Sequence, residues 1–268
     1  MILEGRTAIV TGGGSGIGRA GSIAMAREGA TVVVTDRDAA AAAATVGLIA
    51  NEGGRAEPVQ LDVTDDRAIV SVIDDVARRL GRIDILHNHA GIQVAGSLDE
   101  VRASDFDRSW AVNVHAQFVA CQAVLPVMKK QGRGVILNTS SNSGVFLDRA
   151  MTAYITSKAA SITMTRQIAL DVARFGIRIN ALCPGWVDTP FNDPYTKQLG
   201  GRKSLENAIA NIVPMGRFAT PEEIADVILF MVSDRSSYMT GHALVADGGE
   251  SLAGGTNQGD ATAVAAGF

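Results

Sequence analysis

The sequence predicts an α/β fold in which a doubly wound, parallel sheet of about seven strands is covered by helices on both faces. Short apolar runs alternate with longer stretches of helical periodicity through almost the whole chain. A glycine-rich turn follows the first run, as expected where a strand passes directly into a helix. Because parallel strands joined by helices are buried on both faces, they consist mainly of apolar residues, as these runs do.

The strand candidates are short, apolar and rich in β-branched residues. They lie at residues 7–10, 31–34, 83–86, 134–137, 177–182 and 242–245, with a weaker candidate at 56–61. Helices are predicted between them, at about 16–28, 38–52, 65–80, 104–130, 153–175, 204–212 and 220–233. No linker divides residues 1–250, which we expect to form one domain, followed by a Gly- and Ala-rich C-terminal tail at 251–268.

The composition excludes several classes of protein. The chain has 268 residues, 47% of them hydrophobic, and its net charge of −4 gives no basic footprint for nucleic acid. No basic leader precedes an apolar stretch and no run approaches about 18 apolar residues, so neither a signal peptide nor a membrane span is expected. Cys121 and Cys183 lie in apolar contexts and are predicted to be buried, reduced thiols of a cytoplasmic protein.

The glycine-rich turn predicts a nucleotide site. Gly12, Gly16 and Gly18 fall between the first strand and the first helix, in the run Thr11-Gly12-Gly13-Gly14-Ser15-Gly16-Ile17-Gly18. Glycines there let the backbone approach a pyrophosphate, which accepts hydrogen bonds from the free amides of the helix N-terminus. This arrangement is typical of a Rossmann-type dinucleotide site.

An acidic residue at the end of the second strand indicates which dinucleotide. Asp36 can accept hydrogen bonds from an adenosine ribose, and its charge would repel a 2′-phosphate, so NAD is favoured over NADP. Arg37 follows and could reach such a phosphate. Ser15, and not a basic residue, occupies the nearest position of the turn, which again favours NAD.

Two side chains four residues apart indicate acid–base chemistry. Tyr154 and Lys158 share one face of a predicted helix. A neighbouring ammonium favours the phenolate, so we expect it to lower the pKa of the tyrosine from its usual value near 10. Such a tyrosine can exchange a proton with an alcohol. The same spacing also arises by chance, with the lysine solvated beside a half-buried ring.

Taken together, these residues resemble the short-chain dehydrogenases/reductases over residues 5–249. The motifs of that family occur in order: Thr11-Gly12-x3-Gly16-Ile17-Gly18, Asp62-Val63, Asn88-His89-Ala90-Gly91, Asn113-Val114, Ser141, Tyr154-x3-Lys158, Asn180-x3-Pro184-Gly185-x3-Thr189 and Asp247-Gly248-Gly249. The resemblance implies that residues 1–250 are a dinucleotide-binding catalytic domain with a substrate loop at about 190–214.

The resemblance assigns catalytic roles to four residues. Ser141 matches the serine that hydrogen-bonds the substrate oxygen, and Tyr154 matches the general acid/base. Lys158 matches the residue that lowers the pKa of the tyrosine and holds the nicotinamide ribose. Asn113 matches the residue that supports an ordered water linking the lysine to solvent. NAD would accept hydride from the alcohol carbon while Tyr154 removes the hydroxyl proton.

The resemblance also assigns the cofactor contacts along the chain. They are Gly12, Ser15, Gly16, Ile17, Gly18, Asp36, Arg37, Asp62, Val63, Asn88, Ala90, Gly91, Tyr154, Lys158, Pro184, Gly185, Val187 and Thr189. His89 departs from the pattern, because the family usually has a second asparagine there. His87 and His89 point to one face of a strand, but no cysteine or carboxylate partner stands near, so structural histidines are favoured over a metal site.

Substrate specificity is expected from the segments that meet above the tyrosine. The candidates are Gln93, Ser141, Asn142, Arg149, Tyr154, Trp186 and Asn192. Their mixed polar and apolar character suits a small polar hydroxyl compound, such as a sugar or polyol, better than a hydrocarbon alcohol. The same residues are also compatible with ordinary solvent-facing loops.

Two other functions stay open from the sequence. The chain also resembles 3-oxoacyl-carrier-protein reductases in length, although Asp36 argues against NADPH. A non-catalytic, NAD-binding regulatory protein is the other alternative, against which the complete set of catalytic residues speaks.

The helix at 153–175 carries enough apolar surface to pack a second helix as well as the sheet, so a homo-oligomer is expected, and the resemblance points to a homotetramer.

Overall fold

A seven-stranded parallel sheet organises the computed structural model, which describes residues 1–253. The strand order is β3-β2-β1-β4-β5-β6-β7, and every neighbouring pair is parallel. The strands are β1 (Thr7–Thr11), β2 (Thr31–Asp36), β3 (Arg55–Gln60), β4 (Ile85–Asn88), β5 (Gly134–Thr139), β6 (Ile177–Pro184) and β7 (Ala243–Ala246). The predicted α/β fold class is confirmed, including the weak third strand.

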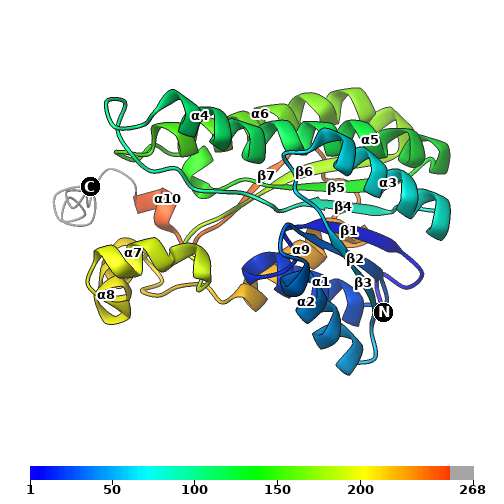
Figure 1. Cartoon of the computed structure of the whole chain (residues 1–268), viewed down its shortest axis with the longest axis horizontal. Coiled ribbons are helices and arrows are strands. Elements are labelled where there is room, and N and C mark those ends of the chain that lie inside the picture. Colours follow the sequence, from blue (N-terminus) through cyan, green and yellow to red (C-terminus); the bar gives the residue numbers. More distant parts are fainter. Residues whose placement is uncertain (254–268) are drawn as a thin grey trace.

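Helices cover both faces of this sheet (Figure 1). One face carries α1 (Gly16–Arg27), α2 (Ala39–Asn51) and α9 (Pro221–Val232). The other face carries α3 (Asp66–Leu80), α4 (Ala103–Trp110), α5 (Ala116–Gln131) and α6 (Thr152–Val172). Helix capping sets several of these boundaries: Thr220 and Glu223 form a reciprocal capping box at α9, and Asp38 and Asp65 cap α2 and α3.

Alternate residues of each strand enter different hydrophobic layers. Val10 and Leu137 belong to the cluster under α1, α2 and α9, whereas their neighbours Ile9 and Ile136 belong to the cluster under α3, α5 and α6. Because both sides of each central strand are buried, the sequence of a strand reads as a continuous apolar run rather than an alternating one. This double burial holds the carboxyl ends of the strands rigidly at one edge, where the site lies.

Three predicted elements differ from the structure. The strand expected at 83–86 begins two residues later, at Ile85, and continues through the buried polar residues His87 and Asn88. The helix expected at 104–130 is interrupted by a π-helical turn, η1 (Ala111–His115), between α4 and α5. The expected loop at 190–214 contains α7 (Asp193–Gln198) in addition to α8 (Arg202–Ile212), because Tyr195 packs into a small local core.

The long helical run Ala103–Gln131 is apolar and long enough, by length and composition alone, to cross a membrane. Its buried residues Val119, Val124 and Met128 belong to the cluster formed with the strands and α3. We therefore interpret it as a core helix of the α/β layer. The same test is met by many helices that pack against a sheet.

A separate lobe lies at one end of the sheet (Figure 1). It contains α7 and α8, and its core is made of Tyr195, Leu205, Ile209, Val213 and Phe218, with Trp186 against it. The short helix α10 (Glu250–Ala253) follows β7 at the same end of the molecule. Residues 251–253 of the expected tail are thus helical, and 254–268 lie outside the described residues. Short helical turns complete the chain: η2 (Asn142–Gly144), η3 (Ala173–Phe175), η4 (Pro190–Asn192) and η5 (Asp234–Ser236).

Two glycine substitutions should change stability in opposite directions. A Cβ added at Gly18 would lie 2.2 Å from the carbonyl oxygen of Gly12, so Gly18→Ala must displace the turn after β1. We expect it to lower the free energy of unfolding by about 1–3 kcal/mol. Exposed Gly47, on α2, has open space around it, so Gly47→Ala should raise that free energy by about 0.5–1 kcal/mol. Urea titration at one protein concentration measures both, and a Gly18→Ala variant as stable as the parent would contradict the packing described.

Candidate active site

The carboxyl ends of the strands open onto a cavity of about 830 Å³. Loops after β1, β2, β4, β5 and β6 line it, as expected at the switch point of a doubly wound sheet. The structure brings together most of the predicted residues there: Gly12, Ser15, Gly16, Ile17, Asp36, Arg37, Asp62, Val63, Ala90, Gly91, Ser141, Tyr154, Lys158, Pro184, Gly185, Val187, Thr189 and Asn192.

Three predicted residues lie behind the cavity wall. Gly18 packs against the carbonyl of Gly12 and acts on the shape of the turn. Asn88 is buried and donates from Nδ2 to Oδ1 of Asn138 at 2.9 Å, which ties β4 to β5. Asn113 is fully buried and hydrogen-bonds the backbone of Ile92, which lines the cavity. The spacing of residues in the sequence does not tell whether a residue contacts a ligand or only supports residues that do.

The turn after β1 has the geometry of an anion cradle. Gly12 and Gly16 have φ of 68° and 50°, which favours glycine. A Cβ at Gly12 would lie 2.9 Å from Cα of Ala90. Ser15 precedes α1 without a side-chain capping bond, so the first amides of this helix keep their capacity to donate to a ligand. The residues present therefore fit the pyrophosphate of a dinucleotide.

Asp36 is fixed against this turn. Its Oδ2 accepts from the amide of Gly14 at 3.0 Å, and its Oδ1 accepts from the amide of Asp38 at 3.0 Å. Arg19, which sequence reasoning missed, braces the same turn: its guanidinium donates to the Gly14 carbonyl and, at 3.1 Å, to Oγ1 of Thr45. In the sequence, Arg19 is distinguished only by its position in the first turn of the helix, and no motif predicts that it braces the glycine turn.

Helix α6 presents the predicted catalytic pair, Tyr154 and Lys158, to the cavity. Tyr154 and Lys158 are both buried, and Nζ of Lys158 lies 5.6 Å from the centre of the tyrosine ring. This Nζ donates to the carbonyl oxygen of Thr139, the last residue of β5, at 3.2 Å. The pairing predicted from the four-residue spacing is therefore present, with the strand end holding the ammonium.

Burial displaces the pKa of both groups. It raises the pKa of Tyr154 to about 12, although a hydrogen bond with Ser141 acts in the opposite direction. It lowers the pKa of Lys158 to about 8, because the ammonium has left water. Burial of the phenolate is the largest cause of the shift of Tyr154 in the protein alone, and the lowering of its pKa by Lys158 stays a prediction.

The π-helical turn η1 directs Asn113 toward the pair. Its Oδ1 accepts from the amide of Ile92 at 2.9 Å, and its Nδ2 donates to the carbonyl of Ile92 at 2.9 Å. A Cβ added at Gly91 would lie 3.2 Å from Oδ1 of Asn113 and 3.2 Å from Nζ of Lys158. Asn113, Gly91 and Lys158 therefore converge, in a space that a side chain at position 91 would fill.

The two strand histidines share one hydroxyl. Oγ1 of Thr139 lies 2.9 Å from Nε2 of His87 and 3.3 Å from Nδ1 of His89. Nδ1 of His87 is buried without a hydrogen-bond partner, so the arrangement that leaves the fewest donors unpaired has His87 donating to Thr139 and Thr139 donating to His89. His89 then carries its proton on Nε2, and its ring lines the cavity.

Burial lowers the pKa of both imidazoles, that of His89 to about 4, so they are neutral near pH 7. Within residues 1–253, no group of three or more His, Cys, Asp or Glu side chains could hold a metal ion. The interpretation of His87 and His89 as structural histidines stays a prediction, and it rests on their shared hydrogen-bond partner, Thr139.

Most of the predicted substrate residues use their polar groups inside the protein. Gln93 donates to the hydroxyl of Tyr195, and Nδ2 of Asn192 donates to the carbonyl of Val187 at 2.6 Å. Asn142 and Trp186 both donate to one carboxylate, that of Glu250. Arg149 is exposed. Of the seven candidates, Ser141, Tyr154 and Asn192 line the cavity.

Glu250 is a partly buried residue that sequence reasoning missed. Its Oε2 accepts from Nδ2 of Asn142 at 2.7 Å, and its Oε1 accepts from Nε1 of Trp186 at 3.1 Å. Burial raises its pKa to about 7. It stands directly after the Asp247-Gly248-Gly249 motif, which was the one available signal.

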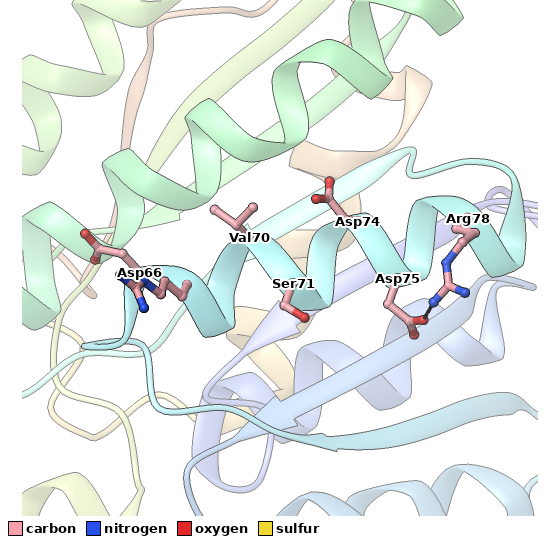
Figure 2. Close-up of a pocket in the computed structure, with 7 residues that line it drawn as sticks. Asp66, Val70, Ser71, Asp74, Asp75 and Arg78 are labelled. Carbon is pink, nitrogen blue, oxygen red and sulfur yellow. Dashed lines mark hydrogen bonds and ion pairs between the residues drawn. The ribbon is translucent and has the colours of Figure 1, made fainter.

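A second hollow, of about 680 Å³, lies along the outer side of α3 (Figure 2). Its lining side chains all come from that one helix, and Asp75 is paired with Arg78 and Arg79. Exposed pairs of this kind are solvated and contribute little to stability. We therefore place the candidate site in the cavity at the strand ends and not here.

The chain matches known proteins over nearly its whole length. A family model described as enoyl-(acyl carrier protein) reductase matches residues 12–251. A 3-oxoacyl-[acyl-carrier-protein] reductase of Thermotoga maritima is 40% identical over 249 residues, covering 93% of this chain and 99% of the relative. A 2-keto-3-deoxy-L-fuconate dehydrogenase of Xanthomonas campestris is 38% identical and covers 92% of this chain and 80% of the relative. The crystal structure of levodione reductase superposes with a TM-score of 0.90 at 32% identity, covering 94% and 99% of the two chains.

The neutral histidines predict a dependence of stability on pH. An unfolded histidine gains a proton below about pH 6.5, whereas His89 resists protonation until about pH 4. The unfolded state therefore binds more protons in this window, and stability should fall as pH drops from 6.5 to 4, by up to about 1.4 kcal/mol per pH unit for each such histidine. His89→Asn should make this slope shallower in urea titrations. His115→Asn, which removes a half-exposed histidine, is the control, and equal slopes in the His89→Asn and parent proteins would refute the assignment.

Proposed function

Because the chain belongs to the short-chain dehydrogenase/reductase family, we propose that it is an NAD-dependent oxidoreductase that interconverts a polar secondary alcohol and its carbonyl. The observation that carries this proposal is the convergence of Ser141, Tyr154 and Lys158 at one end of a cavity, supported by buried Asn113. A regulatory protein that only binds a nucleotide has no need of these four groups. Their presence favours catalysis.

A nicotinamide dinucleotide fits the residues of the cavity. The turn at Gly12–Gly18 and the free amides of α1 would hold its pyrophosphate, and Asp36 would hold the adenosine ribose. Other lining residues are Asp62, Val63, Pro184, Gly185, Val187 and Thr189, of which Thr189 lies against Gly16. When bound, the nicotinamide ring supplies the acceptor or donor of a hydride.

The side chains of this chain handle the proton. Tyr154 would remove the hydroxyl proton of an alcohol, or give its own proton to a carbonyl oxygen in the reverse direction. Ser141 would hydrogen-bond the same substrate oxygen without changing the charge of the site. Lys158 would stabilise the developing phenolate, and Asn113, which touches the backbone of Ile92, would keep the lysine end of the relay in place.

The charge at Asp36 supports NAD as the cofactor. A 2′-phosphate near this carboxylate would meet a like charge, whereas a ribose hydroxyl would meet an acceptor. Arg19, the basic residue closest in sequence to the turn, is engaged with Gly14 and Thr45. Arg37 lines the cavity and is the residue most able to compensate for a phosphate.

The surroundings of Tyr154 support an uncharged, polar substrate such as a sugar or polyol. Asp148 and Asp247 each act through their charge on Glu250, so carboxylates stand near the loops that carry Ser141 and Trp186. This charge disfavours anionic substrates.

A second candidate, a 3-oxoacyl-carrier-protein reductase, is favoured by the similarity to the Thermotoga maritima enzyme of that name. Its substrate carries an acidic protein, which fits this side of the cavity less well.

We further propose that the active form is a homotetramer. Several large apolar side chains are exposed on the layer of α4, α5 and α6, among them Trp110, Phe118 and Leu170. Leu170 is 79% exposed although it stands on the 21-residue helix α6. Burial of this face against a second copy would remove the apolar surface from water.

Replacing Asp36 should change the choice of cofactor. Asp36→Asn removes the charge that repels a 2′-phosphate while it keeps an acceptor for the amide of Gly14. We expect the ratio of the Kd for NADPH to the Kd for NADH to fall at least about tenfold, or about 1.4 kcal/mol. Quenching of protein fluorescence measures both constants without a substrate.

Asp38→Asn is the matched control, because Asp38 also lines the cavity and asparagine can still cap α2. A tighter Kd for NADPH than for NADH in the parent protein would overturn the assignment of NAD.

Tyr154→Phe should abolish turnover and spare cofactor binding. Removing the proton donor and acceptor should lower kcat by about 10²–10⁴-fold, and the Kd for NADH should stay within about threefold. NADH absorbance would follow the oxidation of sugars, polyols, hydroxy acids and cyclic alcohols by NAD. Reduction of an acetoacetyl thioester with NADH and with NADPH would test the 3-oxoacyl-carrier-protein reductase. Tyr238→Phe, at a fully exposed tyrosine, is the control.

The raised pKa of Tyr154 gives this test a pH signature. Because the phenol keeps its proton near pH 7, alcohol oxidation should accelerate as pH rises, and carbonyl reduction should slow. A Tyr154→Phe variant that retained kcat would exclude the tyrosine as the proton donor. Binding of NADH without turnover of any compound in the panel would favour a regulatory protein.

A further inference from the structure

We propose that Glu250 is a positioning residue for the substrate side of the site, because its carboxylate fixes both the loop that carries Ser141 and the loop that carries Trp186. This inference rests on the proposed function and assigns a role to a residue that lies outside the proton relay. It concerns the residue that fixes the position of the pocket wall, and the effect of that position on the hydrogen bond between Ser141 and a substrate oxygen.

The carboxylate joins three segments that are distant in the sequence. It accepts from Asn142, which follows Ser141 directly, at 2.7 Å, and from the indole of Trp186 at 3.1 Å. The two donors come from η2, after β5, and from the segment after β6, whereas Glu250 begins α10, after β7. These three segments flank the same end of the sheet, so one side chain sets their spacing.

The Asn142 amide passes this constraint to the serine. An ionised carboxylate can only accept hydrogen bonds, so Glu250 requires Asn142 to present its Nδ2 and to turn its Oδ1 the other way. That Oδ1 lies 3.3 Å from Oγ of Ser141. The serine hydroxyl also accepts from the amide of Ser143 at 3.2 Å. Asn142 Oδ1 is therefore one acceptor for the single proton of the serine, beside Tyr154. The amide of Asn142 is oriented by Glu250 at 2.7 Å and, more weakly, by Oδ2 of Asp247 at 3.5 Å.

The indole passes the constraint to the other wall of the pocket. Trp186 contacts Tyr195 edge to face, with ring centres 5.1 Å apart, and Phe218, with ring centres 6.2 Å apart. The hydroxyl of Tyr195 in turn accepts from Gln93. Asn142 and Trp186 thus share Glu250 as their acceptor, and Gln93 joins the same network through Tyr195.

The charges around Glu250 make this network sensitive to pH. Asp247, on the preceding turn, and Asp148, on the loop after η2, both raise its pKa, and the two donors lower it. Burial is the largest cause, and the pKa is about 7. Below this value the carboxyl gains a proton and loses an acceptor position, so the bonds to Asn142 and Trp186 cannot both persist unchanged.

A fluorescence experiment tests the network without any substrate. The chain has two tryptophans, so Trp110→Phe leaves Trp186 as the only indole. Indole emission responds to a charge beside the ring nitrogen, and we expect the emission of Trp186 to change between pH 6 and pH 8 with a midpoint near 7. Glu250→Gln in the same background should abolish this transition, whereas Glu222→Gln, an exposed site on α9, should leave it intact. A transition that persists in Glu250→Gln overturns the proposal.

Kinetics test the consequence for catalysis, with the compound of the alcohol panel that gives the highest kcat/KM. Glu250→Gln, which keeps one acceptor, should raise KM at least about fivefold at pH 8, and Glu250→Ala should raise it more, while the Kd for NADH stays within about twofold. The parent KM should rise as pH falls from 8 to 6, and that of Glu250→Gln should not. An unchanged KM in both variants overturns the proposal.

A double variant distinguishes positioning from a general loss of packing. If Glu250 acts through Asn142, the effects of Asn142→Ala and Glu250→Ala on kcat/KM should overlap, so the double variant should lose clearly less than the product of the two single losses. Losses that multiply within about twofold contradict the proposal. If the panel gives no turnover, the proposed function fails, and the emission of Trp186 still decides whether the network exists.

Discussion

The burial of the Lys158 ammonium is the constraint on which the rest of the site depends. A charge out of water needs partners, and the carbonyl of Thr139, at the end of β5, is one of them. The neighbouring space has to stay free of side chains, which accounts for Gly91. The π-helical turn between α4 and α5, on the same face of the sheet as α6, places Asn113 beside this space. A sheet buried on both faces supplies the rigidity that keeps these parts in register.

Desolvation, more than attraction between the pair, sets the protonation of the relay. The pKa of Tyr154 rises and that of Lys158 falls, so each group is pushed toward its uncharged form. The spacing of Tyr154 and Lys158 in the sequence predicts only the attraction between a phenolate and an ammonium. The larger effect belongs to the tertiary structure, because it depends on how completely both groups are covered.

The fold and the centre of the site followed from local patterns. Apolar runs identified the strands, and the glycine turn, Asp36 and the Tyr154–Lys158 spacing identified the cavity, because each is a short motif at the end of one strand or on one helix. The features that escaped prediction depend on contacts between distant segments. Glu250 meets Asn142 across 108 positions, and the residues that hold α7 in place come from a lobe whose core has no repeating pattern. The π-helical turn was hidden because its residues continue a helical period.

Thr139 takes part in two networks with different atoms. Its carbonyl accepts from the ammonium of Lys158, while its hydroxyl hydrogen-bonds one nitrogen of each of the imidazoles of His87 and His89. Asp36, in contrast, touches only the turn and the start of α2. The two ends of the cavity therefore differ in how freely they can be changed. A substitution at Asp36 acts on the turn and the start of α2, whereas a change of side chain at Thr139 acts on the buried imidazoles and can shift the strand end that holds the ammonium of Lys158.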